Sequence, residues 1–407
     1  MTLSRRSLLG SAALATTLPL ARARAQAPTL RIGVLTDLSG PYQDTTGRTS
    51  VICTQQAVDE FASAHGLAVQ VLSADHQNKP DVGAGIARQW FDRDGVDVVI
   101  DVPNSAVALA VAAVAHEKDK VMIASSSATT VLTGEQCSPG TIHWTFDTYM
   151  LSHSTGGALV RAGGDSWYFI GADYAFGHTL ADDTAAVIRK AGGKVLGSVF
   201  YPSPGTTDFS SFLLQAQASG AKVVGFANAG AETINCVKQA HEFGLTSSAK
   251  LAALLMYVTD VHALGLDTAQ GLSLTETFYW DLNDRTRAFT DRVRAKTPSN
   301  IPNMDHAGCY AGALHYMKAA AAMGMAEAKR SGAATVGRMK AMPTDDDCFG
   351  PGSIRADGRV LHPAYLFEAK RPAESKGAWD LLRLAATTPA EEAFRPLAEG
   401  RCPLVHA

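Results

Sequence analysis

From Leu30 onward, short apolar and β-branched runs alternate with longer amphipathic stretches, and Gly, Asp, Asn and Pro occupy the turns between them. This alternation is typical of α/β architecture, in which helices connect the strands of a sheet. A fully apolar run such as Val98-Val99-Ile100 suits a strand of a parallel sheet that helices cover on both faces. The pattern therefore predicts an α/β fold built on parallel sheets.

The alternation falls into two series that meet near Asp147. The first predicts strands at 30–35, 68–72, 96–101 and 121–124, with helices at about 48–63, 81–93 and 104–117. The second predicts strands at 167–171, 194–200, 222–227, 251–255 and 272–275, with helices at about 175–191, 208–218, 230–242 and 258–264. Two similar series in one chain imply two Rossmann-like βα lobes.

The pattern changes after the second series. It predicts helices near 284–297 and 304–324, followed by a turn rich in Pro, Gly and Asp at 342–352. Asp357-Gly358 stands between alternating apolar residues, which is a strong signal for a β-hairpin. The tail 372–407 is mixed in composition, and we expect it to pack as short irregular elements.

Residues 1–25 have the features of a cleaved export signal. Arg5-Arg6 precedes an apolar run that ends near Leu20, and Ala23-Arg24-Ala25 supplies small residues before a cut. The run is too short to cross a bilayer, and Pro19 interrupts it. We therefore expect a periplasmic protein, exported by a twin-arginine-like or a general route.

Charge and length limit the partners of the mature chain. Cleavage after residue 25 removes four arginines, so the formal net charge of −3 becomes −7. No window concentrates Lys and Arg, which argues against nucleic acid as a partner. No second apolar segment reaches membrane-spanning length, and a chain of this size normally divides into about two domains.

The cysteines do not form a metal-binding pattern. All six are widely scattered, with no Cys-x-x-Cys and no His at ligand spacing. An oxidising compartment permits disulfides, but six cysteines allow 15 pairings. We expect mostly buried free thiols with one or two bridges, and neither a metal nor a cofactor.

Several segments resemble one family. Arg31-Ile32-Gly33-Val34-Leu35 is followed by Asp37-Leu38-Ser39-Gly40-Pro41-Tyr42, and Asp173-Tyr174-Ala175-Phe176-Gly177 and Thr207-Asp208-Phe209-Ser210 come later in the same order as in the family. This chain resembles the type I periplasmic solute-binding proteins of ABC importers, specifically the leucine/isoleucine/valine-binding (branched-chain amino acid) class. The resemblance covers almost the whole mature chain.

The resemblance implies two lobes, joined by hinge crossovers, that close on a ligand like a Venus flytrap. Lobe one would comprise residues 27–146 and 279–352, and lobe two residues 147–278 and 353–407. It also implies a small-molecule ligand, either an amino acid or another carboxylate, and an ABC permease in the inner membrane as the partner of a monomer.

The resemblance places ligand contacts in two loops of lobe one. Ser105, with Asn104 beside it, matches the serine that binds the ligand's carboxylate at the start of a helix, where backbone N–H groups and the helix dipole favour an anion. Ser127, Ala128 and Thr129 match the loop that contacts an amino-acid head group. The alternative is that Asn104 or Ser105 only caps its own helix.

Other candidate contacts come from strand ends and crossovers. Tyr174 matches the aromatic residue that covers the ligand from lobe two, and Asn228-Ala229 follow a strand that supplies another wall. Tyr42 and Tyr257 stand at predicted strand ends, where rings can stack on an apolar or planar ligand. Tyr174 as an ordinary turn residue remains the alternative, and Phe278-Tyr279-Trp280 is expected to pack the hinge.

The sequence leaves the charge of the ligand open. An α-amino acid needs an acid for its ammonium group, because a buried unpaired charge is costly. Asp260, after the predicted strand 251–255, and Asp44, in the first loop, are the candidates. If neither faces the ligand, the solute would be a carboxylate without an amine, and the aromatic residues would suit an aromatic acid.

Two other functions compete with import. A Rossmann-like fold also hosts enzymes such as hydrolases, but the chain has no Gly-x-Ser-x-Gly elbow, no Walker loop and no complete dinucleotide fingerprint. We therefore expect no catalysis. A periplasmic ligand sensor for a signalling receptor would share both fold and site, and the sequence does not separate it from an importer component.

Overall fold

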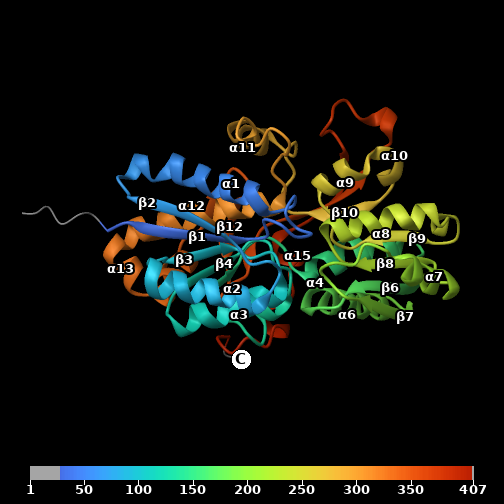
Figure 1. Ribbon diagram of the computed structural model, residues 1–407, viewed down its shortest axis with the longest axis horizontal. Helices are drawn as coiled ribbons and strands as arrows, with labels where there is room; N and C mark the ends of the chain where they lie inside the picture. The colour runs from blue at the N-terminus through green and yellow to red at the C-terminus, as the bar shows by residue number, and fades with distance from the viewer. Residues whose placement is uncertain (1–27, 406–407) are drawn as a thin grey trace, which may run out of the picture.

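The computed structural model describes residues 28–405, so the expected export signal at 1–25 lies outside the described residues. Two parallel β-sheets lie beside each other along the molecule's long axis (Figure 1). The first sheet has the order β2-β1-β3-β4-β5. Its strands are β1 (Leu30–Thr36), β2 (Val69–Asp75), β3 (Val98–Asp101), β4 (Val121–Ala124) and β5 (Thr141–His143).

Helices cover both faces of the first sheet, which explains why its strands are apolar throughout. Ile32 and Val34 of β1 pack in the core shared with α1 and α12, whereas Leu35 packs with α2 and α3 on the opposite face. In Figure 1, α1 lies above this sheet and α2 and α3 lie below it. The helices are α1 (Gly47–Phe61), α2 (Pro80–Gln89) with a π-helical turn (Trp90–Asp94), α3 (Ser105–Glu117), α12 (Met304–Met323), α13 (Met325–Arg330) and α14 (Gly332–Lys340).

The second sheet has the order β7-β6-β8-β9 and is also parallel. Phe169 of β6 packs in the same core as α6, whereas Ile170 packs with α7 and α8 on the other face. The strands are β6 (Ser166–Ala172), β7 (Lys194–Tyr201), β8 (Val223–Ala227) and β9 (Lys250–Ala253), and the helices are α6 (Ala175–Lys190), α7 (Ser210–Ala218) and α8 (Gly230–Glu242). The two predicted Rossmann-like lobes are therefore present.

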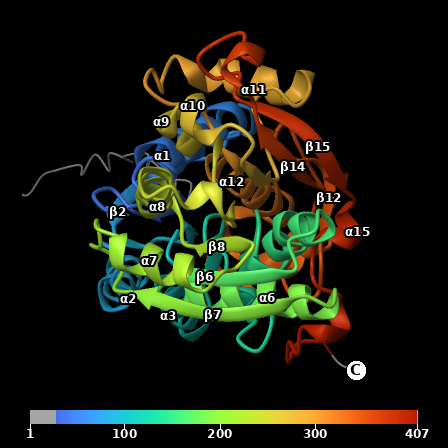
Figure 2. The same cartoon turned by 90° about the vertical axis from the view of Figure 1, so that its right-hand side faces the viewer.

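Chain segments pass between the lobes after β5, β10 (Ser273–Glu276) and β13 (Val360–Leu361). Leu274 of β10 packs in the second lobe's core, whereas Phe278 lies in the core that includes α12. Trp280 packs against both cores, as expected for a residue at the hinge. Strands β14 and β15 run side by side at the right-hand edge of the view in Figure 2.

Three predictions about the later chain need correction. Strand β10 does not extend the second parallel sheet but pairs antiparallel with β14 (Ala364–Ala369). The tail is not wholly irregular, because β15 (Leu382–Thr388) pairs with β14. The predicted turn at 342–352 contains β11 (Thr344–Asp346) and the start of β12 (Gly350–Ile354).

The hairpin at Asp357-Gly358 is confirmed, since β12 pairs antiparallel with β13 on either side of it. Gly358 has φ +89°, a conformation that glycine adopts without steric cost. The sequence patterns did not predict several short helices. These are α4 (Thr148–Leu151), a π-helical turn (Ser152–Gly156), α5 (Gly157–Arg161), α10 (Leu266–Ala269), α13, α14 and α15 (Ala390–Ala393). The sequence patterns did predict α9 (Val258–Leu264) and α11 (Asp284–Arg294).

One disulfide joins Cys137 to Cys402, and the other four cysteines are buried and free. This agrees with the expectation of mostly free thiols. The bridge ties the end of the tail to the segment that follows the Ser127–Thr129 loop, where Arg395 also donates to the carbonyl of Thr130. Within residues 28–405, no helix is long and apolar enough to cross a membrane.

Candidate ligand-binding cleft

A cavity lies between the lobes at the carboxyl ends of both parallel sheets, where α/β proteins bind their ligands. Its enclosed volume is about 10 Å³, which is room for about one water molecule and far less than a bound solute needs. The walls are mostly aromatic and small apolar side chains. They are formed by Tyr42, Thr45, Thr46, Pro103, Ser126, Ala128, Tyr174, Phe176, Ala229, Leu255, Tyr257 and Asp305.

The loop after β1 is held in shape by the buried carboxylate of Asp37. One oxygen accepts from the backbone N–H of Gly40 at 2.6 Å, and the other accepts from the N–H of Tyr42 at 2.9 Å and from the amide of Asn78 at 2.8 Å. A carboxylate that binds several N–H groups fixes the backbone around it. The Asp-x-Ser-Gly-Pro-Tyr segment therefore presents the Tyr42 side chain to the cleft.

Tyr42 meets Tyr174 across the cleft. Their hydroxyl oxygens lie 2.5 Å apart, and either can be the donor. Tyr174 immediately precedes α6, so the Asp-Tyr-x-x-Gly turn supplies this contact from the second lobe. Burial raises the pKa of both phenols, so both are neutral at physiological pH. The lobes are thus in contact in this structure, with two predicted site residues at the point of contact.

A strained turn brings Pro103 into the cavity wall. Asp101 and Val102 have φ of +85° and +58°, values that non-glycine residues seldom adopt. The turn is stabilised by bonds on both sides, since the N–H of Val102 donates to the carbonyl of Leu35 at 2.9 Å and Ser126 hydrogen-bonds the Asp101 carboxyl. Strain of this kind persists only where the surroundings enforce it and often marks a functional site.

Asn104 and Ser105 lie behind the cavity wall. The side-chain oxygen of Asn104 accepts from the N–H groups of Ala106 and Val107 at 3.0 and 3.1 Å, which caps α3. The Ser105 hydroxyl oxygen accepts from the N–H groups of Ala128 and Thr129 at 3.4 and 3.3 Å. Asn104 therefore caps its own helix and Ser105 supports the Ser127–Thr129 loop, while the contact of either residue with a ligand stays a prediction.

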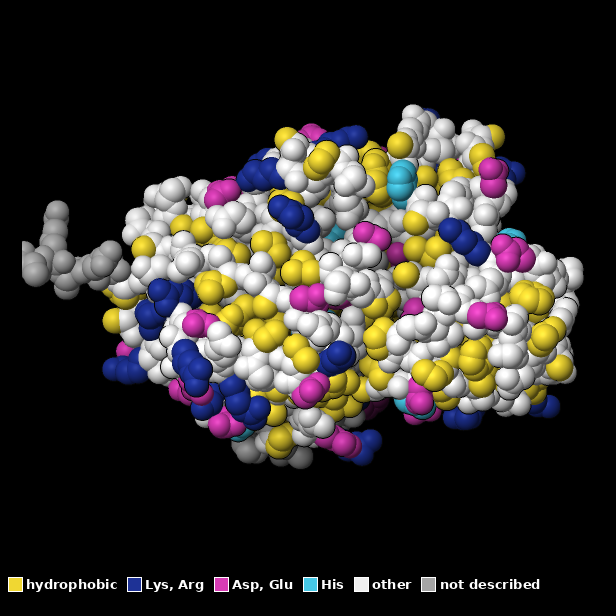
Figure 3. Space-filling model, in the orientation of Figure 1, with side chains coloured by type: hydrophobic (Ala, Val, Ile, Leu, Met, Phe, Trp, Pro, Cys, Tyr) yellow, Lys and Arg dark blue, Asp and Glu magenta, His cyan; other side chains and the backbone are white. Residues whose placement is uncertain are grey.

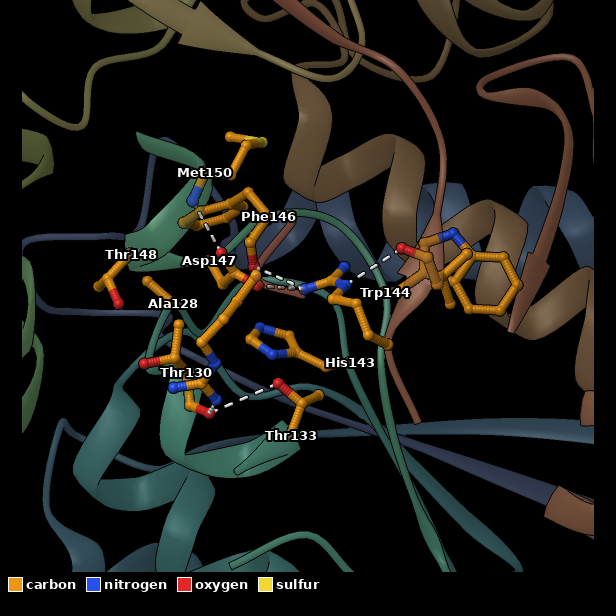
Figure 4. A network of polar contacts seen from close by, with 12 residues as sticks. Ala128, Thr130, Thr133, His143, Trp144, Phe146, Asp147, Thr148 and Met150 are labelled. Carbon is orange, nitrogen blue, oxygen red and sulfur yellow. Dashed lines mark hydrogen bonds and ion pairs between the residues drawn. The ribbon is translucent and has the colours of Figure 1, made fainter. Parts of the chain in front are cut away.

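The Ser127–Thr129 loop follows β4, and its three residues have different environments. Ala128 lines the cavity. The buried Ser127 hydroxyl has no hydrogen-bond partner, while its carbonyl accepts from Nε2 of His143 at 2.6 Å. Thr129 uses its hydroxyl to accept from the N–H of Val131 at 3.3 Å. Figure 4 shows Ala128 beside His143 and the crossover residues Phe146 and Asp147, so this loop is packed against a hinge segment.

That hinge segment contains a buried ion pair. Arg359 is fully buried, lies 3.6 Å from Asp147 and donates to the carbonyl of Phe146 at 3.1 Å. Its guanidinium also stands over the Phe394 ring, 4.3 Å from the centroid. Burial lowers the pKa of Arg359 to about 10, a value at which it still carries a charge at neutral pH. The ion pair thus links Asp147 in the first crossover to Arg359, which directly precedes β13 and the third crossover.

The second lobe supplies a wall through the turn after β8. Ala229 lines the cavity, whereas the Asn228 side chain turns inward, accepting from the Thr233 hydroxyl at 2.7 Å and donating to the Cys236 sulfur at 3.2 Å. Gly230 follows with φ +60°, and a Cβ there would lie 2.5 Å from the carbonyl oxygen of Pro41. Only glycine permits this approach of the lobes.

Of the two acids proposed for an ammonium group, neither is among the residues lining the cavity. Asp260 lies in the first turn of α9, is buried, and accepts from the N–H of Tyr257 at 3.1 Å. Asp44 is exposed and lines a separate outer hollow of about 510 Å³ that also includes Arg48 and His262. Tyr257 itself lines the inner cavity, as predicted for a ring at a strand end.

The acid that does line the cavity is Asp305, in the first turn of α12. No sequence motif singles it out, because α12 follows the second βα series by some thirty residues and returns to the cleft only in three dimensions. The predicted site also lacked six other lining residues, of which Thr45, Pro103 and Ser126 adjoin a predicted site residue and Phe176 lies in the Asp-Tyr-x-x-Gly motif, whereas Thr46 and Leu255 do neither.

Comparison with known proteins places this geometry in a family. Residues 29–378 match a family model described as periplasmic binding protein. A crystal structure of a periplasmic binding protein from Burkholderia mallei is 44% identical, with 92% of this chain and 99% of that chain covered and a TM-score of 0.89. No curated protein gives a significant match.

Two further structures share the fold. A branched-chain amino acid ABC transporter periplasmic ligand-binding protein from Burkholderia xenovorans is 37% identical, with 92% and 99% coverage and a TM-score of 0.80. A solute-binding protein from R. palustris, in complex with 4-hydroxybenzoate, is 21% identical, with 90% and 99% coverage and a TM-score of 0.79. The chain therefore belongs to the type I periplasmic binding proteins, a family of extracytoplasmic solute-binding proteins and not of enzymes.

Proposed function

We propose that this protein is the solute-binding component of an ABC importer and captures a small carboxylate or amino acid, branched-chain or aromatic, between its lobes. The relative from Burkholderia xenovorans is described as a branched-chain amino acid transporter component, and relatives of the same fold were solved with benzoate and 4-hydroxybenzoate. The observation that carries the proposal is a cavity whose walls come from both lobes and include four aromatic rings, those of Tyr42, Tyr174, Phe176 and Tyr257.

In this proposal the protein binds without chemistry. Lobe one presents Tyr42 and the Ser127–Thr129 loop, and the ligand's carboxylate would lie near that loop and the amino end of α3, where the helix dipole favours an anion. Lobe two then closes through Tyr174 and Ala229. Closure is driven only by interactions that the ligand makes better in the closed state than in the open state.

The division into moving parts is also proposed. Residues 27–146 and 279–352 would form one lobe and residues 147–278 and 353–407 the other, with the crossovers as hinge. The closed form of a monomer would then dock on an ABC permease after export to the periplasm. On the face that Figure 3 shows, basic side chains stand among acidic ones and form no continuous basic surface, which suits a small-molecule ligand better than a polyanion.

The test is a ligand screen on the purified mature protein. Thermal unfolding would be measured with aliphatic amino acids, aromatic amino acids and aromatic carboxylates, after native mass spectrometry has identified any ligand carried through purification. We expect at least one class to raise the unfolding temperature in a concentration-dependent way. Small-angle scattering should then show a smaller radius of gyration with the ligand than without it. No stabilisation by any class, or an unchanged radius at saturation, would contradict the proposal.

A further inference from the structure

Asp305 is a buried acid without a partner inside the proposed binding cleft. Its side chain is 1% exposed and lines the cavity, its carboxyl oxygens make no close hydrogen bond, and the Tyr257 hydroxyl lies near enough to favour its charged form. An unsatisfied buried carboxyl is costly, so native proteins seldom keep one without a function. By contrast, Asp37 in the neighbouring loop binds three N–H groups and a side-chain amide.

The surroundings of Asp305 are acidic. Asp101, Asp260 and Glu276 are buried near enough to affect its ionisation, and each disfavours a negative charge on it. No Lys or Arg is among the described residues that line the cavity. Within residues 28–405 no group of His, Cys, Asp or Glu is arranged to hold a metal ion. No cationic side chain among the described lining residues therefore compensates Asp305.

The remaining walls suit a cation as well. The rings of Tyr42, Tyr174, Phe176 and Tyr257 line the same cavity, and aromatic faces attract ammonium groups. Asp305 lies in the first turn of a 20-residue helix, where the dipole favours a carboxylate. An ammonium group beside Asp305 would thus pair with an ionised carboxylate and contact the aromatic rings of the cavity wall.

We propose that Asp305 receives a protonated amine of the ligand, so the solute is an amine-bearing molecule and most simply an amino acid, not an amine-free carboxylate. This inference rests on the proposed function and assigns the ammonium to a residue of α12 in place of Asp260 or Asp44. A neutral hydroxyl of the ligand would satisfy one oxygen of Asp305 but would leave the acidic surroundings uncompensated, whereas an ammonium provides both donors and charge.

The ionisation of Asp305 is consistent with this assignment. Burial and the neighbouring acids hold its pKa well above the usual range, while the nearby Tyr257 hydroxyl lowers it. Without a ligand, these surroundings therefore favour the protonated form of the carboxyl. When a cationic ligand binds, that proton is released to solvent, and the carboxylate and the ammonium form a buried ion pair.

The test uses ligands that differ only at the amine. L-phenylalanine, 3-phenyllactate and 3-phenylpropanoate form one set, and L-leucine, its 2-hydroxy analogue and 4-methylpentanoate form another. Binding would be measured by calorimetry in two buffers of different ionisation enthalpy, which reports the number of protons released. We expect the amine member of at least one set to bind at least tenfold more tightly than both of its analogues, with net proton release.

Two variants locate the interaction. Asp305→Asn removes the charge with little change of shape and should lower the affinity for the amine ligand about 10- to 100-fold, while leaving the amine-free analogues within about threefold. Asp183→Asn is the matched control, because Asp183 is an acid in α6 that accepts from the Thr148 hydroxyl at 2.6 Å and does not line the cavity. It should leave both affinities unchanged.

The outcomes separate this inference from the proposed function. Amine-free carboxylates binding as tightly as amino acids, or Asp305→Asn binding the amine ligand normally, would overturn the inference and leave the proposed function standing. Binding of phenethylamine or 3-methylbutylamine with no binding of any carboxylate or amino acid, and its loss in Asp305→Asn, would support the role of Asp305 while removing the carboxylate from the proposed function.

Discussion

The Tyr42 hydroxyl lies 2.5 Å from the Tyr174 hydroxyl, and this hydrogen bond joins the loop after β1 in one lobe to the start of α6 in the other. A second bond close by links the N–H of Ala231 to the carbonyl of Pro41 at 3.1 Å. The lobes therefore make direct contacts of their own, and a ligand adds to these when it stabilises closure.

Removing one hydroxyl of the pair should weaken ligand binding. Tyr174→Phe keeps the ring in the cavity wall but deletes the bond to Tyr42, which is worth about 0.5–1.5 kcal/mol. We therefore expect the dissociation constant to rise about two- to tenfold in a calorimetric titration. Tyr168→Phe, on β6 and outside the cavity lining, is the control. Equal affinities for Tyr174→Phe and the control would show that the tyrosine bond does not contribute to closure.

Gly230→Ala should hold the lobes apart. The added methyl group would lie 2.5 Å from the carbonyl oxygen of Pro41, and φ of +60° disfavours alanine as well. We expect the protein to fold, to have a larger radius of gyration, and to bind ligand at least tenfold more weakly.

Gly220→Ala separates backbone strain from the steric clash. Gly220 has a similar φ of +68° in the same lobe, but a Cβ added there would have no atom within 4 Å. Gly220→Ala should lose about as much unfolding free energy as the positive φ costs in Gly230→Ala, while its affinity for the ligand stays unchanged. If both variants bind ligand equally well, the approach of Gly230 to Pro41 is not needed for closure.

The stability of the ligand-free protein should fall as pH rises from 6.5 to 8.5. Burial raises the pKa of Asp260 to about 7 and that of Glu276 to about 8. The folded protein therefore keeps protons that the unfolded chain has lost, and this stabilisation is complete below about pH 4 and disappears as pH passes 7 and 8. The nearby charge of Asp44 also raises the pKa of Asp260, and that of Asp260 raises the pKa of Glu276, whereas the backbone N–H groups of Tyr257 and Val258 lower the two values by less than burial raises them.

Thermal unfolding at several pH values checks this prediction. Glu276→Gln should unfold with a shallower dependence on pH between 7 and 8.5 than the unchanged protein. Burial raises the pKa of Asp183 only to about 6, so Asp183→Asn should keep the original slope in that interval. A rise of the unfolding temperature toward pH 8.5 would contradict the prediction.

Reduction of the Cys137–Cys402 bridge should destabilise the protein, since it cross-links positions 265 residues apart. A disulfide of this kind typically contributes about 2–4 kcal/mol. A reductant should therefore lower the unfolding temperature of the unchanged protein. It should not affect a Cys137→Ser/Cys402→Ser double variant, which should already unfold at the lower temperature. A reductant effect of equal size on both proteins would assign it to another cause.

Substitution of Asn104 should affect stability more than binding. Asn104→Ala removes the cap that accepts from two N–H groups of α3 and should cost about 1 kcal/mol of unfolding free energy. Asn104→Ser retains a capping oxygen and should recover most of that loss. We expect both variants to bind ligand within about threefold of the unchanged protein. A large loss of affinity in Asn104→Ser would instead assign Asn104 to the ligand, as the family resemblance implies.

Much of the fold was predictable because its signals are local. Strand β4 runs from Val121 to Ala124 and helix α8 from Gly230 to Glu242, as the alternation of apolar and amphipathic stretches indicated. Strand β10 was placed in the wrong sheet because its apolar pattern does not reveal its partner, and β14, which pairs with it, follows some ninety residues later. Strand β15 was not predicted at all, since five of its seven residues are exposed and lack an apolar period.

The candidate site could be predicted only in the loops that follow predicted strands. Tyr42, Ala128, Tyr174, Ala229 and Tyr257 all line the cavity, and each follows a predicted strand. Asp305 was not found, because it stands on a helix that reaches the cleft by returning across the hinge. The lack of an ion-pair partner for Asp305 follows from the tertiary structure and cannot be read from the neighbouring residues in the sequence.

The disulfide also determines what a single cut in the chain would do. Because Cys137 precedes the first crossover and Cys402 lies almost at the end of the described chain, both ends of the second lobe belong to one covalent ring. A protease that cleaves an exposed loop of that lobe, such as the turn at Gly244, would leave two polypeptides that migrate together on a non-reducing gel and separate only after reduction. All three crossovers thus lie within the loop that the disulfide closes, so the two fragments of a cleaved molecule stay covalently joined.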